Sequence, residues 1–436
     1  MTAAPGGTLG STRPDPAPRP PGVRIVLDAR ALQEPERAPL TAAYLEGLLE
    51  AFDDDPLPGE SFALLLGSDR DDPTERYRRL IVVGRRLLPP TRLLRSGALT
   101  IDPFVLSGAS IGAAWRAERS GAAGAVYHAI GGSMPLATGL PVVVTLLDLA
   151  PWELPDAYQR GAAARFGRRL RGRLLRDASA VIVGSETVAA TARRLLHLRR
   201  SRIRVVPLAP RPAFTILPPA GAGDRHASAM TTDPRAERER LGLPDRYVVY
   251  SGRYDARQDL ATLLRALAMM AEAGRPEGLA DGDPWPPRVL FADASPADRA
   301  SLARAAGREG VGEALVYAPR LDDARLAGLV RGARAALLPA LSDASGLPAI
   351  EAIACGVPVV ASAVGALPEI VGAAGILVEP RDPARLAQAL ETAVADDLVH
   401  AQLVAAAVER ASSDRRTWAD VARETRSIYA EVGIAG

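Results

Sequence analysis

The stretch LLPALSDASGLPAIEAIACGVPVVAS, residues 337–362, changes character several times within a short distance. It opens with an apolar run, as in a strand that is buried on both faces. Residues 342–346 are turn formers, Pro348 suits the first turn of a helix, and Gly356 is a natural helix end. A second apolar run follows. The stretch therefore predicts a strand, a loop, a short helix and another strand.

Such a unit directs the free N–H groups of a helix start toward the carboxyl edge of a parallel sheet, where anions bind. Glu351 lies about one turn into the predicted helix, so its carboxylate can border an occupant of that edge. Asp343 lies eight positions earlier, in the loop, and can reach the same space from another side. The break in the apolar pattern predicts a binding site.

Strand-like and helix-like segments alternate along most of the chain in two series, separated by a segment rich in Pro, Gly, Ala and Ser. This pattern predicts an α/β protein of two doubly wound, Rossmann-like domains with a cleft between them. The expected order is a disordered tail (1–22), a first, acceptor-side domain (23–209), a linker or insertion (210–240), a second domain (241–412) and a C-terminal helix (413–436) that packs back on the first domain.

Composition excludes several classes of function. All 53 basic residues are arginines, so Schiff-base chemistry and a lysine-bearing phosphate loop are ruled out. A net charge of +2 and few aromatic residues argue against a nucleic-acid partner. The four histidines lack the spacing of a zinc site, and no metal is expected. No apolar run reaches the length of about 18 residues that spans a membrane.

Segments spread over nearly the whole chain from about Val23 carry a resemblance to a known family. They include SDASGLPAIEAIACGVPVVASAVGALPEIVGAAGILVEPRDPARLAQAL (342–390), YVVYSGRYDARQDLATLLRAL (247–267), VVVTLLDLAPWELPDAY (142–158) and RIRVVPLAP (202–210). The first resembles the nucleotide-sugar signature of retaining GT-B glycosyltransferases of family four, and the others match further landmarks of that family. The resemblance implies hexosyl transfer from a nucleotide sugar to a hydroxyl acceptor, without a metal ion and without any other cofactor.

The resemblance also implies roles for individual residues. Glu351 would hold the ribose hydroxyls, Asp343 would contact the transferred sugar, and Arg253 would bind the diphosphate. The rest of the implied site consists of backbone N–H groups and a second guanidinium, namely Ser345, Gly346, Leu347 and Arg257. Arginines and a helix dipole can stabilise a leaving diphosphate in place of a metal.

Three departures make the catalytic motifs degenerate. The family lysine is Gln258 here, although Arg257 is its neighbour. Leu147 replaces the family histidine that faces the transferred sugar, and the Gly-rich turn after the first strand is replaced by PLTAAY at 39–44. These changes leave two alternatives open. One is a catalytically impaired scaffold or silent partner of an active transferase, and the weaker one is a nucleotide-sugar epimerase.

Several residues have a structural interpretation beside the functional one. Glu351 could lie on the exposed face of a short helix, and Asp343 could cap that helix or shape its loop. Arg253 could form a structural ion pair, and His128 could be a hydrogen-bonded core residue. For Glu369, the favoured interpretation is an ordinary polar position on a helix face. The arginine run at 165–176 could contact anionic lipid or an anionic acceptor, but a solvated helix that turns Phe166, Leu170 and Leu174 inward is favoured.

The expected partners are a nucleotide sugar and a glycan, lipid or small-molecule acceptor, with peripheral membrane contact and a partner transferase as further possibilities. The expected location is the cytoplasm, with peripheral attachment to the inner membrane face as an option. The sequence does not identify the base, the sugar, the acceptor or the oligomeric state.

Overall fold

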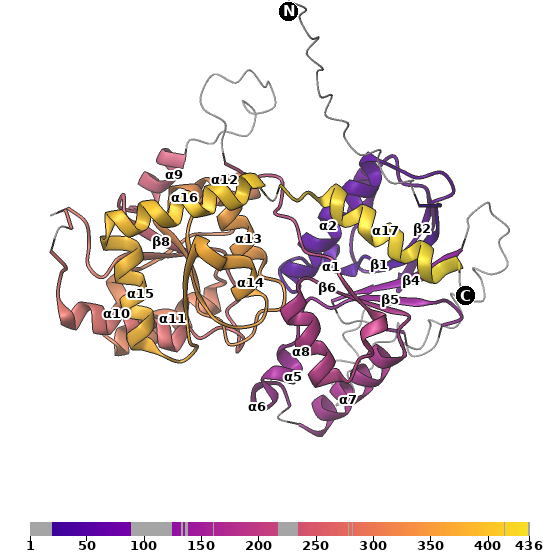
Figure 1. Cartoon of the computed structure of the whole chain (residues 1–436), viewed down its shortest axis with the longest axis horizontal. Coiled ribbons are helices and arrows are strands. Elements are labelled where there is room, and N and C mark those ends of the chain that lie inside the picture. The colour runs from indigo at the N-terminus through magenta and orange to yellow at the C-terminus, as the bar shows by residue number, and fades with distance from the viewer. Residues whose placement is uncertain are drawn as a thin grey trace, which may run out of the picture.

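The computed structural model describes residues 20–88, 124–131, 134–135, 138–159, 161–216, 234–277, 279–280, 282–413 and 415–434. The chain forms two lobes, each built around a parallel sheet (Figure 1). Most of the predicted tail (1–22), and residues 217–233 of the predicted linker (210–240), lie outside the described residues. None of the helices within the described ranges has the length and apolar character needed to cross a bilayer.

The first lobe contains a seven-stranded parallel sheet. Its strands, in spatial order, are β3 (Val82–Leu88), β2 (Ser61–Gly67), β1 (Arg24–Asp28), β4 (Ala125–Ile130), β5 (Val142–Thr145), β6 (Ala180–Val183) and β7 (Ile203–Val205). Its helices are α1 (Arg30–Gln33), α2 (Pro39–Asp54), α5 (Ala150–Glu153), α6 (Pro155–Tyr158), α7 (Ala162–Asp177) and α8 (Glu186–Leu196). The central strands are buried on both faces because helices cover both sides of the sheet.

The second lobe repeats this design around six parallel strands. In spatial order they are β10 (Leu315–Tyr317), β9 (Arg288–Phe291), β8 (Tyr247–Tyr250), β11 (Ala335–Leu338), β12 (Val359–Ser362) and β13 (Gly375–Val378). The helices are α9 (Pro234–Arg240), α10 (Leu260–Ala273), α11 (Pro296–Arg308), α12 (Asp323–Gly332), α13 (Leu347–Ala354), α14 (Leu367–Val371), α15 (Pro383–Ala395) and α16 (Asp397–Ser413). Helix α9 falls within the range expected to be a linker, and its Glu237 forms a 2.7 Å ion pair with Arg325 of α12.

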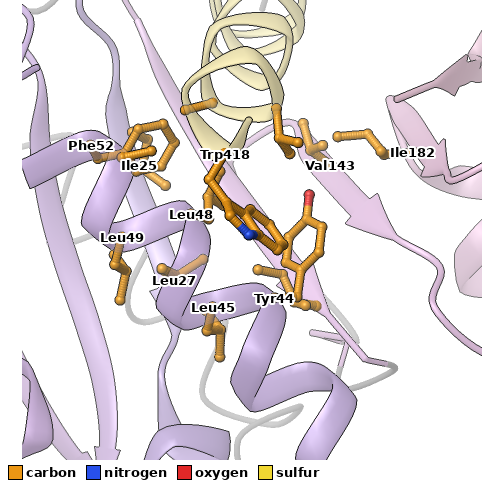
Figure 2. Close-up of a cluster of buried hydrophobic side chains, with 14 of the residues drawn as sticks. Ile25, Leu27, Tyr44, Leu45, Leu48, Leu49, Phe52, Val143, Ile182 and Trp418 are labelled. Carbon is orange, nitrogen blue, oxygen red and sulfur yellow. The ribbon is translucent and has the colours of Figure 1, made fainter. Parts of the chain in front are cut away.

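The last helix, α17 (Trp418–Ile434), leaves the second lobe and packs on the first (Figure 1). Trp418 meets Tyr44 of α2 edge to face, with ring centroids 5.5 Å apart (Figure 2). A buried ion pair joins Arg426 to Glu60, with a nitrogen–oxygen distance of 2.6 Å. The chain thus crosses between the lobes twice. It enters the second lobe after β7 and returns to the first lobe before α17.

Both sheets have a switch point, where successive connections leave in opposite directions. In the first lobe it lies between β1 and β4, and in the second between β8 and β11. Ligands of doubly wound proteins bind outside the carboxyl ends of the strands at such points. The segments that follow β8 and β11 in the second lobe are thus the place to look for a site.

Candidate functional site

The loop after β11 and the start of α13 form one wall of this site. The helix begins at Leu347, with Pro348 in its first turn, as the sequence predicts. Gly346 precedes it with φ of 61°, in the left-handed region that favours glycine. A Cβ at this position would lie 2.1 Å from Ile370, so any side chain would force the loop away from α14.

Asp343 shapes this loop from within. Its Oδ1 accepts hydrogen bonds from the N–H groups of Gly346, at 2.7 Å, and Ser345, at 3.0 Å. The N–H of Leu347 donates to the Ser345 hydroxyl at 3.4 Å. Burial raises the pKa of Asp343, and the hydrogen bonds from Gly346 and Ser345 oppose that shift. The donors expected to hold a phosphate are therefore satisfied by groups of the protein itself.

Glu351 is 3% exposed, and its carboxylate is paired with Arg211. The guanidinium donates from Nε to Oε1 at 2.6 Å and from Nη2 to Oε2 at 3.0 Å, which is a bidentate arrangement. Arg211 also pairs with Asp323 at the start of α12. Burial raises the pKa of Glu351, whereas Arg211 lowers it. The alternative that Glu351 lies on an exposed helix face is wrong.

Two arginines follow β8 at the site. Arg253 is 32% exposed and donates from Nε to Asp255 at 3.1 Å. Arg257 also contacts Asp255, with Nε 2.9 Å from Oδ1, and its Nη1 lies 2.6 Å from Oδ2 of Asp148. Asp255 is thus shared by two guanidinium groups. Despite its burial, hydrogen bonds and charges from Arg257 and the charge of Arg253 hold its pKa at about 2.

The contact between Arg257 and Asp148 joins the lobes, because Asp148 follows β5 of the first lobe. A second contact joins Ser342 to Glu153 of α5. A third is made by Glu369, which accepts hydrogen bonds from the N–H of Thr187 at 3.1 Å and from the N–H of Glu186 at 3.3 Å, both at the start of α8. Glu369 is an exposed polar residue on α14, as the favoured interpretation expects, and its carboxylate in addition caps a helix of the other lobe.

Three parts of the chain depart from the family pattern, and the structure shows where each of them lies. Leu147 is 5% exposed and belongs to the core of the first lobe. The side-chain oxygen of Gln258 is buried and has no partner among the described residues. PLTAAY at 39–44 forms the first turns of α2, beginning at Pro39. Leu147 and this segment are built into the framework of the first lobe, so these departures also shape the fold.

His128 is fully buried and structural. Its Nδ1 lies 2.6 Å from the Tyr429 hydroxyl of α17, and its Nε2 lies 2.8 Å from the Thr145 hydroxyl. Burial lowers its pKa to about 3. Among the residues that the structure describes, no group of three or more His, Cys, Asp or Glu side chains is placed to hold a metal ion.

The sequence correctly placed five residues in one loop and the helix that follows it, because turn formers and helix signals act over a few positions. They are Asp343, Ser345, Gly346, Leu347 and Glu351. Sequence reasoning missed Arg211, which lies at the junction between the lobes, and did not predict the role of Asp148. The one available signal for Arg211 was its place just after the first-domain motif RIRVVPLAP.

Comparison with known proteins gives a family match for the second lobe. Residues 233–410 match the family described as glycosyl transferases group 1. This segment belongs to that family. It runs from α9 to α16, so Arg253, Arg257, Asp343 and Glu351 all lie in the glycosyl transferases group 1 segment, whereas Arg211 lies outside it.

One relative extends beyond this segment. It is a D-inositol 3-phosphate glycosyltransferase from Xylanimonas cellulosilytica, 32% identical over 298 residues. The aligned part is 65% of this chain and 62% of the relative, so the match spans about three fifths of that protein.

Solved structures show that the two lobes, as far as the structure describes them, have the GT-B fold. Sucrose-phosphate synthase from Thermosynechococcus elongatus is similar with a TM-score of 0.69 and 22% identity, covering 95% of this chain and all of that one. HepE from Anabaena, solved in complex with UDP, is similar with a TM-score of 0.63 and 17% identity, covering 94% of this chain and all of that one.

Proposed function

We propose that this protein is a glycosyltransferase that moves a hexosyl group, with retention, from a nucleotide sugar to a hydroxyl acceptor without a metal ion. The family match of residues 233–410 supports the reaction class. The observation that carries the proposal for the site is the convergence of Arg253, Arg257 and the start of α13 at the switch point between β8 and β11. This is the chemistry that a diphosphate requires.

In this proposal the diphosphate lies between the two arginines and the loop before α13. It takes over the N–H groups of Ser345 and Gly346, which Asp343 holds in its absence. The released Asp343 carboxylate can then turn toward the sugar. Positive charge and N–H dipoles fixed beside the leaving diphosphate stabilise the charge that develops there, which is commonly worth about a hundredfold or more per contact.

Glu351 keeps its partner and still binds the donor. A carboxylate has about four acceptor positions, and the bidentate contact with Arg211 uses two of them. The remaining positions can accept hydrogen bonds from ribose hydroxyls. Arg211 thereby fixes the carboxylate in one orientation, so Glu351 does not need to reorient on binding.

The acceptor enters from the first lobe, opposite Asp343. The contacts of Asp148, Glu153 and Glu369 hold the lobes together, and closure of this kind excludes water from the donor. D-inositol 3-phosphate is one acceptor to test, because a relative is named for it. Glycans, lipid hydroxyls and other small molecules are the remaining classes.

A second candidate is a nucleotide-binding scaffold that does not turn over. Two observations favour it: Leu147 supplies no polar contact to the sugar, and Asp343 already satisfies the N–H groups of the loop. Such a protein would bind a nucleotide sugar and could support an active transferase as its partner.

Release of nucleoside diphosphate from UDP-, GDP-, ADP- and dTDP-hexoses, with and without acceptors, separates the two candidates. We expect acceptor-dependent release from one donor, reduced about a hundredfold in Arg257→Gln because one charged contact to the leaving group is lost. Arg265→Gln, on the exposed face of α10, is the matched control and keeps full activity. Donor binding without release from any of them would reject the transferase in favour of the scaffold.

A further inference from the structure

The charge of the chain is distributed unevenly. Twelve of the 53 arginines and only two of the 51 acidic residues lie between positions 161 and 204. This segment therefore carries a net charge of +10, and the rest of the chain carries −8. Asymmetry of this size within a nearly neutral protein indicates a surface that meets an anionic partner.

Helix α7 concentrates this charge on one side. Four of its exposed arginines recur at spacings of three and four, which puts them on one stripe of the helix, whereas the exposed Arg171 lies off this stripe and the exposed Asp177 borders its C-terminal end. We call this stripe the basic face, and it consists of Arg165, Phe166, Arg169, Arg173 and Arg176. Within the described part of the chain, none of its four guanidinium groups has a carboxylate partner.

The opposite side of α7 is the one that packs. Leu175 is buried, and Leu174 is partly buried against the same core cluster. Phe166, which the sequence predicted to point inward, is 51% exposed. That prediction is wrong because the inner face is centred on the buried Leu175, which lies about half a turn round the helix from Phe166, so the aromatic ring falls among the arginines.

The basic face is reinforced beyond the helix. Arg202 donates to the carbonyl oxygens of Arg176, at 2.6 Å, and Ala178, at 2.9 Å, at the end of α7. This holds the turn that contains the exposed Arg199 and Arg200 next to the helix. Figure 1 shows α7 at the lower end of the first lobe, clear of the second lobe.

We propose that the basic face docks on a lipid bilayer that contains anionic phospholipids, with Phe166 entering the headgroup region. The charge complementarity is direct, since each arginine near an anionic surface adds to binding. Phe166 also suits a membrane. An exposed ring among guanidinium groups gains from burial at the boundary between headgroups and acyl chains.

Flotation with vesicles tests this proposal on the full chain. Phosphatidylcholine vesicles are compared with vesicles that contain 30% phosphatidylglycerol, in low and high salt. We expect binding to the anionic vesicles that weakens with salt. The quadruple variant Arg165→Gln, Arg169→Gln, Arg173→Gln, Arg176→Gln should lose at least about tenfold in partition coefficient.

A matched control carries the same loss of charge elsewhere. It replaces four exposed arginines on the outer helices of the second lobe with Gln, namely Arg265, Arg304, Arg308 and Arg385. Its vesicle binding should stay within about twofold of the unchanged protein, whereas an equal loss would show a nonspecific charge effect and overturn the proposal.

Phe166→Ala separates membrane insertion from charge. We expect it to lose about threefold to fivefold in partition coefficient, while Leu398→Ala, at a position 71% exposed on α16, changes nothing. Thermal unfolding of each variant checks that the fold is intact. Failure of the unchanged protein to float with anionic vesicles, or binding through the basic face to a DNA or RNA oligonucleotide alone, would overturn the proposal.

Discussion

At the scale of single residues, the polar groups of the site are held by one another. Asp343 satisfies the N–H groups of the loop, Arg211 holds Glu351, and Asp255 lies between Arg253 and Arg257. Each of these groups has a partner before any ligand arrives. A ligand that binds here must therefore exchange contacts, and the order of exchange can be tested residue by residue.

Asp343→Asn keeps an oxygen that accepts from Gly346 and Ser345 but removes a negative charge beside the expected diphosphate. We expect a nucleoside diphosphate to bind about tenfold tighter, because like charges at close range repel. Asp382→Asn is the matched control, since Asp382 caps the remote helix α15 in the same manner. Titration calorimetry measures both, and weaker binding to Asp343→Asn would contradict this account of the loop.

His128 gives the protein a pH-dependent stability. The unfolded chain takes up a proton there below about pH 6.5, whereas the folded chain does so only near pH 3. The free energy of unfolding should therefore fall as the pH drops through this window, by up to ~1.4 kcal/mol per pH unit from this residue. Urea unfolding of His128→Gln should show a shallower slope between pH 6 and 4.

The same variant should be less stable at pH 7 by about 1–3 kcal/mol, because the hydroxyls of Tyr429 and Thr145 lose a well-placed partner. His197→Asn controls for the loss of a histidine, since His197 is exposed at the end of α8 and asparagine tolerates its left-handed backbone. An unchanged slope in His128→Gln would show that His128 does not control the acid sensitivity.

Among the helices and strands, those marked by short-range sequence signals were the ones that could be predicted. The strand, loop and helix around residues 337–362 follow from turn formers, Pro348 and Gly356, which act over a few residues. Strand β3 was not expected, because its sequence VVGRRLL lacks the apolar run of the inner strands and lies at the edge of its sheet. Phe166 was misplaced because a helix rich in arginine defines its inner face only through its contacts.

The packing of α17 on α2 depends on a missing side chain. A Cβ at Gly47 would lie 2.2 Å from the Trp418 ring. Gly47→Ala should lower the free energy of unfolding by about 1–3 kcal/mol through overpacking, although alanine favours the helix. The same change at Gly172 of α7, where the nearest atom lies 3.7 Å away, should stabilise by about 0.5–1 kcal/mol. Equal effects at both sites would contradict this account of the contact.

At the scale of the whole molecule, the contacts that sequence reasoning missed are those between distant segments. Glu351 and Arg211 are 140 positions apart, and Arg257 and Asp148 are 109 apart, so no local pattern reports either pair. The two chain crossings are also tied together, since Arg416 donates to the Pro207 carbonyl at 2.5 Å and Trp418 to that of Pro210 at 3.1 Å. These contacts define how the lobes face each other across the site.

The most direct test is titration calorimetry of Arg253→Gln and the unchanged protein with UDP-, GDP-, ADP- and dTDP-hexoses. The central claim, that the second lobe holds a diphosphate-linked sugar beside α13, predicts that at least one of them binds and that Arg253→Gln weakens it about tenfold or more, because one charge-assisted contact is lost. Arg265→Gln should bind as the unchanged protein does. Absence of binding by every donor, or equal affinity for Arg253→Gln, would contradict the claim.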